Sequence, residues 1–127
     1  MPTLPTLTRV PGQSAMLPGA VIVNGFVFTS GLISPTALAA LSTGADIPAE
    51  RQIRETLEVL AATLTAAGTD VAHVVKVSAF IATADLFDTW NAALLEVWPE
   101  PGPARTTLVA GFPDPEVKFE LEAVAAG

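Results

Sequence analysis

The chain has 127 residues, of which half are hydrophobic and 15% are charged, and its formal net charge at pH 7 is −7. This length predicts a single domain over residues 1–127, and the apolar content is more than a small monomer readily buries, which favours a homo-oligomer. The negative charge and the six scattered cations argue against nucleic-acid binding, and the lack of cysteine and the single histidine exclude disulfides, thiolate chemistry and multi-histidine metal sites.

The first 19 residues contain four prolines and little periodicity, which predicts an extended N-terminal arm over residues 1–15. The arm has no charged start followed by a long apolar block, so it does not have the pattern of a signal peptide. No apolar run in the chain reaches the roughly 18 residues that a membrane span requires. We therefore expect a cytoplasmic protein with no membrane partner.

A β-hairpin is the first regular element that the sequence predicts. Asn24-Gly25 stands between the β-rich runs 20–23 and 26–30. This dipeptide suits a two-residue hairpin turn, because both turn positions require positive φ. Gly31 follows and ends the second strand.

Two helices are predicted further along the chain. Residues 34–49 come first and are expected to form a loop with room for one short turn. Apolar residues at spacings of three and four then predict a helix over 49–67, which Gly68 ends. These apolar residues are Ile53, Leu57, Leu60 and Leu64. Asp85 is expected to cap the second helix. Its apolar face holds Leu86, Trp90, Ala93, Leu94 and Val97.

Residues 71–81 are rich in β-branched side chains and predict the central strand. Both of its faces are mostly apolar, so we expect both to be covered. Two more strands, 105–110 and 117–125, follow the second helix. The element order is then β-β-α-β-α-β-β, an α+β sandwich in which a mixed sheet carries both helices on one face. The other face must meet a second copy of the chain or expose a large apolar patch.

Arg105 stands at the start of an apolar strand, although the chain has only six cations. Alternation places Arg105 and Thr107 on one face of this strand, and Glu120 and Glu122 on one face of the next. If the two strands pair, the guanidinium and a carboxylate can face the same space. Two interpretations remain open. One is a structural ion pair; in the other, Arg105 binds a substrate carboxylate and Glu120 holds or deprotonates a water.

Six pieces of the sequence stand out together. They are Phe28-Thr29-Ser30-Gly31, Ala66-Ala67-Gly68, Val74-Val75-Lys76-Val77, Asn91, Pro103-Ala104-Arg105-Thr106-Thr107 and Glu120-Leu121-Glu122-Ala123. In this order and spacing, across about residues 20–126, they resemble the RidA/YjgF family of reactive-intermediate deaminases. The resemblance implies a chorismate-mutase-like fold that assembles as a trimeric barrel, with sheets inside, helices outside and three clefts between subunits.

The resemblance also implies a reaction. Short-lived 2-imino or enamine acids, such as 2-iminobutyrate and 2-iminopropanoate, would be hydrolysed to 2-oxo acids and ammonia without a metal or an organic cofactor. Arg105 would bind the substrate carboxylate, and Glu120 would position the attacking water. The cleft would be lined by Leu17, Phe28, Ser30, Gly31 and Thr107.

Two departures from the family pattern concern the substrate. Many members carry a cysteine where Thr107 stands, and imino-acid deaminases commonly place a tyrosine where this chain has Met16 or Leu17. The pocket is then more apolar, which leaves open a bulkier unsaturated substrate that resembles 2-aminomuconate. A ligand-binding or protein-protecting trimer without turnover is a further alternative. RNA cleavage fits the negative charge poorly.

The remaining polar and aromatic residues have structural interpretations. His73 is expected to be a satisfied core or interface residue. Trp90 and Trp98 are expected to pack in the core. Glu122 is expected to be solvated or ion-paired, and Lys76 to reach toward solvent or pair with an acid.

Overall fold

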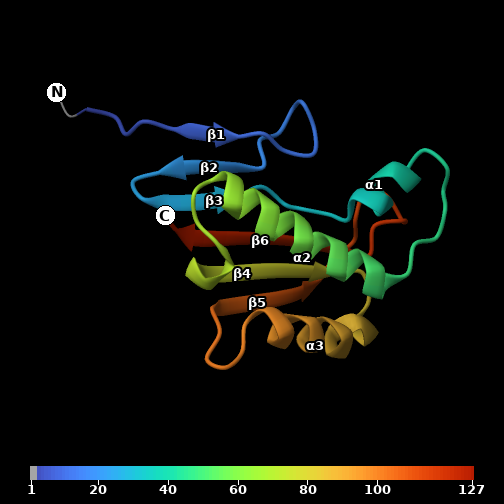
Figure 1. The fold of residues 1–127 in the computed structure, drawn as a ribbon. Helices are drawn as coiled ribbons and strands as arrows, with labels where there is room; N and C mark the ends of the chain where they lie inside the picture. Colours follow the sequence, from blue (N-terminus) through green and yellow to red (C-terminus); the bar gives the residue numbers. More distant parts are fainter. Residues whose placement is uncertain (1–2) are drawn as a thin grey trace.

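A computed structural model describes residues 3–127 and shows one mixed, six-stranded sheet (Figure 1). The spatial order is β1-β2-β3-β6-β4-β5, in which β4 and β5 are parallel and the other neighbours are antiparallel. The strands are β1 (Thr8–Val10), β2 (Ala20–Val23), β3 (Phe26–Thr29), β4 (Val74–Ile81), β5 (Ala104–Val109) and β6 (Phe119–Ala126). The predicted α+β class with a mixed sheet is confirmed.

Helices α2 (Ala49–Ala66) and α3 (Phe87–Val97) lie on one face of the sheet, as expected, and the short α1 (Pro35–Ala40) packs at one end of α2 (Figure 1). Every second side chain of β6, and of β4 from Val77 onward, points toward the helices and is buried there. The core centres on Trp90 of α3 and Phe119 of β6, whose ring centroids are 5.0 Å apart. No described helix is long and apolar enough to cross a membrane.

The opposite face of the sheet is open in the single chain. Phe26 and Phe28 on β3 are each 45% exposed there, and Leu108 on β5 is 54% exposed. Within one chain only one face of strand 71–81 is covered, because both helices that pack on the sheet lie on the same side. An apolar face without a cover is the arrangement that favours contact with a second copy.

The central strand begins later than predicted. Residues Val71–His73 form a 3-10 turn, and β4 starts at Val74. Asp70 stabilises this turn, because its carboxylate accepts a hydrogen bond from the Ala72 backbone N–H (3.0 Å) and contacts His73 Nδ1 (2.8 Å). Of the two positions expected for His73, core or interface, the core position is wrong: within one chain its side chain is exposed and paired with Asp70.

The entry to α3 also differs from the prediction. Asp85 lies in a 3-10 turn, Ala84–Leu86, and accepts a hydrogen bond from the Thr83 hydroxyl. Leu86 occupies the N-cap position of α3 and makes no side-chain cap bond. The prediction that Asp85 caps this helix is therefore wrong, because the extra turn separates it from the first helical residue.

Two further elements were absent from the predicted order. Strand β1 falls within the predicted arm 1–15, of which residues 1–2 lie outside the described part, and pairs with β2 through Arg9 and Val21. Helix α1 falls within the predicted loop. The Ser34 hydroxyl caps it by accepting a hydrogen bond from Ala37 N (3.0 Å), and Pro35 fits the first helical position because it has no N–H to satisfy.

Hydrogen bonds to the Glu55 carboxylate of α2 connect this helix to the N-terminus of α1. The carboxylate accepts hydrogen bonds from the Ser34 hydroxyl (2.7 Å), the Thr36 hydroxyl (3.0 Å) and Arg51 Nε (2.8 Å). Arg51 also donates to Thr36 Oγ1 over 3.1 Å. The hydrogen bonds from Ser34 and from Arg51 lower the pKa of Glu55 from 4.5 to about 2.

We expect Glu55→Gln to reduce the free energy of unfolding at pH 7 by about 2 kcal/mol. Because folding lowers this pKa, the contribution of the carboxylate is fully present above about pH 4.5 and is lost as the pH falls toward 2. Urea unfolding of both proteins at pH 7 and pH 3 checks this, and the difference must shrink at pH 3. Glu58→Gln is the matched control, because Glu58 makes an exposed i,i+4 pair with Arg54 on the same helix.

Candidate functional site

The sheet separates the two principal candidate residues. Arg105 is level with Val77 of β4, whereas Glu120 is level with Phe80 of the same strand. Residues level with one another share a face, and positions 77 and 80 of one strand face opposite sides. The expectation that Arg105 and Glu120 face one space depended on pairing between their two strands, and within one chain the two residues lie on opposite faces of the sheet. Strands β5 and β6 do not pair, because β4 lies between them.

The first half of the candidate site is the edge strand β5 with the α3 residues beside it. Arg105 is exposed, and its guanidinium donates a hydrogen bond to the Asn91 side-chain oxygen. Two residues on, the Thr107 hydroxyl accepts a hydrogen bond from Trp90 Nε1 over 3.0 Å. Asn91 is among the residues that carry the family resemblance, but no role was assigned to it from the sequence. The local pattern that could have indicated its role is a carboxamide directly after a buried tryptophan.

The second half is a cavity of about 150 Å³ beside Glu120. Four of the predicted cleft residues meet here: Leu17, Ser30, Gly31 and Glu120. Further apolar walls come from Leu32, Ile33 and Leu38. The contribution of Leu38 was not foreseen, because it depends on helix α1, which was predicted as loop.

Gly31 and the Glu120 carboxylate lie unusually close together. A Cβ atom at position 31 would be 2.6 Å from Glu120 Oε2 and 2.9 Å from Cδ. Such distances are shorter than a van der Waals contact, so the carboxylate can occupy this place only because residue 31 is glycine. The absence of a side chain at position 31 thus leaves the space that the Glu120 carboxylate occupies.

Ser30 has a structural role that the sequence did not indicate. Its hydroxyl donates to the Pro18 carbonyl over 2.6 Å, and its backbone N–H donates to the Gly19 carbonyl over 2.9 Å. Gln13 fastens the same loop at the other side, because its carboxamide donates to Ile33 O (2.7 Å) and accepts from Ile33 N (3.2 Å). These bonds hold loop 11–18 where Leu17 reaches the cavity.

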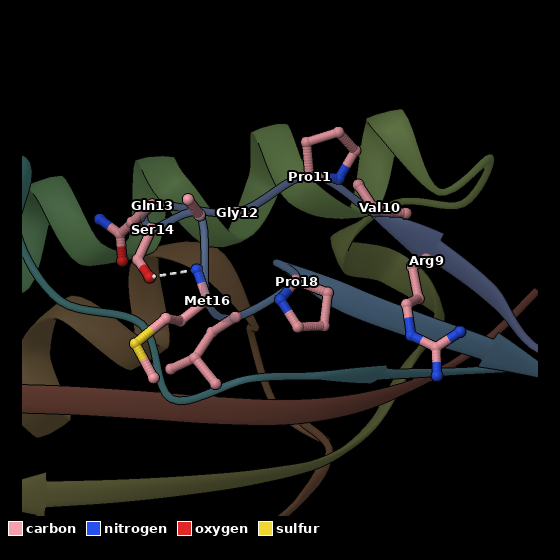
Figure 2. Close-up of a pocket in the computed structure, with 10 residues that line it drawn as sticks. Arg9, Val10, Pro11, Gly12, Gln13, Ser14, Met16 and Pro18 are labelled. Atoms are coloured by element: carbon pink, nitrogen blue, oxygen red, sulfur yellow. Dashed lines mark hydrogen bonds between the residues drawn. The ribbon is translucent and has the colours of Figure 1, made fainter.

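Loop 11–18 also encloses a larger, open hollow of about 580 Å³, shown in Figure 2. Its chain is tightly folded at the base, since a Cβ atom at Gly12 would lie 2.5 Å from Gly19 N. Met16, at the exposed tip, lines this hollow, whereas Leu17 lines both the hollow and the Glu120 cavity. Of the two positions considered for the missing tyrosine, Leu17 is the one beside Glu120.

Phe28 lies apart from the Glu120 cavity. It lines another hollow of about 150 Å³ on the open face of the sheet, together with Lys76, Ser78 and Glu122. Lys76 extends along this face and donates to the Thr106 hydroxyl over 2.8 Å rather than to an acid. Within one chain, therefore, the structure does not bring Phe28 to the other predicted cleft residues.

The Glu120 carboxylate is partly buried, and its environment favours the protonated form. Burial raises the pKa of Glu120, and the negative charge of Glu122 raises it further. Within residues 3–127, no group donates a hydrogen bond to this carboxylate to oppose the shift. A carboxylate with a raised pKa is a stronger base, when ionised, than an ordinary glutamate, which suits it to accept a proton from water.

We expect Glu120→Gln to stabilise the protein at pH 8. Folding raises the pKa of Glu120, so the stability of the wild type falls as the pH rises from the ordinary value of 4.5 through the raised value. Glutamine carries no charge and avoids this loss. Thermal unfolding at pH 5 and pH 8 checks the prediction, with Glu96→Gln on the exposed face of α3 as control. A difference between variant and wild type that does not grow with pH contradicts it.

Comparisons with known proteins agree with the fold. The family model described as endoribonuclease L-PSP matches residues 10–127. Protein mmf2, mitochondrial, from Schizosaccharomyces pombe is 35% identical over 125 residues, which cover 94% of this chain and 99% of the relative. Reactive Intermediate Deaminase A, chloroplastic, from Arabidopsis thaliana is 28% identical over 84% of this chain and 56% of that protein. The crystal structure of RidA from an Antarctic Psychrobacter superposes with a TM-score of 0.77 at 24% identity, over 94% of each chain.

Proposed function

Because this chain belongs to the endoribonuclease L-PSP family, also called the YjgF/RidA family, we propose that it hydrolyses reactive 2-imino or enamine acids to 2-oxo acids and ammonia. The observation that carries the proposal is the exposed guanidinium of Arg105, held by Asn91 at the free edge of β5. A guanidinium has five N–H donors, so most of them remain available for a planar carboxylate.

The chemistry that we propose needs a bound substrate and a placed water. Arg105 binds the substrate carboxylate and thereby fixes the adjacent C=N carbon. Glu120 takes a proton from a water molecule while the water oxygen bonds to that carbon. Glu120 then returns a proton to the imine nitrogen. In the carbinolamine that results, Glu120 takes the hydroxyl proton and delivers it to the amino nitrogen, so that the C–N bond breaks, ammonia leaves and the carbonyl of the 2-oxo acid forms. The side chains named here supply every proton transfer.

The assembly that we propose follows from the separation of Arg105 and Glu120 on opposite faces of the sheet. For both to reach one substrate, Arg105 must come from one copy of the chain and Glu120 from another. A homotrimer with three clefts between subunits provides this arrangement. The exposed apolar residues of the open face, such as Phe26 and Phe28, support burial of that face against neighbouring copies.

The apolar wall formed by Leu17 and Leu38 favours 2-imino acids with apolar side chains, and a bulkier unsaturated substrate resembling 2-aminomuconate is the alternative. A binding or protein-protecting trimer without turnover is the alternative outside catalysis. We propose the cytoplasm as the location. Mitochondria are the alternative compartment, because the name of the relative mmf2 places that protein there. Fractionation of cells that express the full chain distinguishes the two compartments.

The direct test follows the loss of 2-iminobutyrate generated in situ, in competition with semicarbazide. The wild type is expected to reduce the yield of semicarbazone in proportion to its concentration. A panel of 2-imino acids ordered by size then ranks the substrates. A trimer that is stabilised by a 2-oxo acid but accelerates no member of the panel would support the binding alternative and exclude the deaminase.

A further inference from the structure

One partly buried hydrogen bond joins helix α3 to the strand that carries Arg105. Trp90 is fully buried, and its indole N–H donates to the Thr107 hydroxyl over 3.0 Å. The Trp90 ring also packs on Phe119, with 5.0 Å between the ring centroids, and this packing restrains the indole. A buried indole N–H requires an acceptor. The bond therefore fixes the position of the Thr107 oxygen.

The Thr107 hydroxyl keeps a proton to donate. A hydroxyl group has one donor and two acceptor lone pairs, and Trp90 uses one of the lone pairs. Within residues 3–127, no group accepts a hydrogen bond from Thr107 Oγ1. Accepting the indole N–H also polarises the hydroxyl and makes it a stronger donor. A cysteine sulfur in this place would be a weaker acceptor for the indole.

Two consecutive residues of α3 hold two side chains on the same face of β5. Asn91 accepts from Arg105, and Trp90 donates to Thr107. Arg105 and Thr107 are two residues apart in a strand, so their Cα atoms are about 6.6 Å apart and their side chains point to the same side. The guanidinium and the hydroxyl thus form one donor surface, whose two members are both positioned by α3.

We propose that Trp90 is a positioning residue that directs the Thr107 hydroxyl toward the substrate carboxylate bound by Arg105. This inference rests on the proposed function. A carboxylate has about four lone-pair sites, so it can accept hydrogen bonds from the guanidinium and the hydroxyl together. Trp90 itself touches no substrate and acts through Thr107.

The test begins with Trp90→Phe, which keeps an aromatic ring and removes the N–H donor together with part of the buried ring volume. We expect KM for 2-iminobutyrate to rise about fivefold to tenfold. We expect kcat to stay within about twofold, because the carboxylate is bound equally in the ground and transition states. Trp98→Phe is the matched control. Trp98 is also buried and occupies the C-cap position of α3, but its N–H donates to the Val71 carbonyl (2.7 Å), so its loss must leave KM unchanged.

A double-mutant cycle separates positioning from a general structural effect. Trp90→Phe must raise KM in the Thr107→Ser background, which keeps the hydroxyl, and must have no further effect in the Thr107→Val background. An increase that persists in the valine background overturns the inference. The Thr107→Val substitution leaves the Trp90 indole without its acceptor and can impair folding. A second measurement therefore uses the wild type, whose indole ¹H–¹⁵N spectrum is recorded during titration with 2-oxobutyrate. The Trp90 resonance must shift and that of Trp98 must not.

The same variants distinguish this inference from the proposed function. The dissociation constant of 2-oxobutyrate, measured by calorimetry, reports on the carboxylate contact without turnover. If no imine is hydrolysed but the dissociation constants follow the pattern expected from the double-mutant cycle, the deaminase is excluded and the role of Trp90 is retained. Hydrolysis with additive effects of Trp90→Phe and Thr107→Val excludes the role of Trp90 alone.

Discussion

Replacing Arg105 by alanine is expected to lower kcat/KM for 2-iminobutyrate at least about a hundredfold. The guanidinium lies at the exposed edge of β5, and its charge-assisted contact with a carboxylate is worth about 3 kcal/mol, or two factors of ten. The kcat/KM of Arg105→Lys is expected to lie between those of the wild type and Arg105→Ala, because lysine keeps the charge but lacks the planar guanidinium. Initial rates across the KM range provide the measurement.

Arg54→Ala is the control for this substitution. Arg54 is also exposed, lies on α2 and makes a surface pair with Glu58 at 3.7 Å. Its loss removes the same charge from the molecule and is expected to leave kcat/KM within about twofold, since surface pairs contribute little. A folded Arg105→Ala variant that hydrolyses imines as fast as the wild type would remove the basis of the proposed mechanism.

A mixture of the Arg105→Ala and Glu120→Gln variants is expected to recover activity that neither variant has alone. Each variant loses activity by itself, since loss of a general base lowers kcat by about a hundredfold or more. In the proposed assembly each cleft takes position 105 from one subunit and position 120 from another. When equal amounts of the two variants assemble at random, about a quarter of the clefts contain both native side chains.

The measurement compares the two variants refolded together with each variant refolded alone. Mixing Arg105→Ala with the double variant Arg105→Ala/Glu120→Gln is the control, because no cleft then contains a native arginine. Differently tagged chains, purified in sequence, show that mixed oligomers have formed. Mixed oligomers without recovered activity would mean that one cleft does not combine these two residues from different subunits.

Local patterns were sufficient for the elements whose geometry depends on a few neighbouring residues. The predicted hairpin turn occurs at Asn24 (φ 50°) and Gly25 (φ 78°), and the predicted end of the long helix occurs at Gly68 (φ 87°). Each of these positions has positive φ, a conformation that glycine and asparagine tolerate. The helical period over 49–67 likewise placed α2 to within one residue of its observed end.

Local patterns could not show that Arg105 and Glu120 lie on opposite faces of the sheet. Alternation shows which residues of one strand share a face, but it does not show how two strands are aligned with each other. That alignment depends on β4, which lies between β5 and β6 and is separated from both in sequence. The gathering of Leu17, Ser30 and Gly31 around Glu120 followed from the family resemblance and not from any local pattern.

The contact between Gly31 and Glu120 restricts how this protein can change during evolution. A methyl group at position 31 would occupy the space of the acid, so even alanine there would force the carboxylate out of place. The two positions are therefore expected to co-vary, with a side chain at 31 tolerated only beside a shorter one at 120, as in the pair Gly31→Ala and Glu120→Asp. Mutational tolerance at this glycine is set by its partner 89 residues away in sequence.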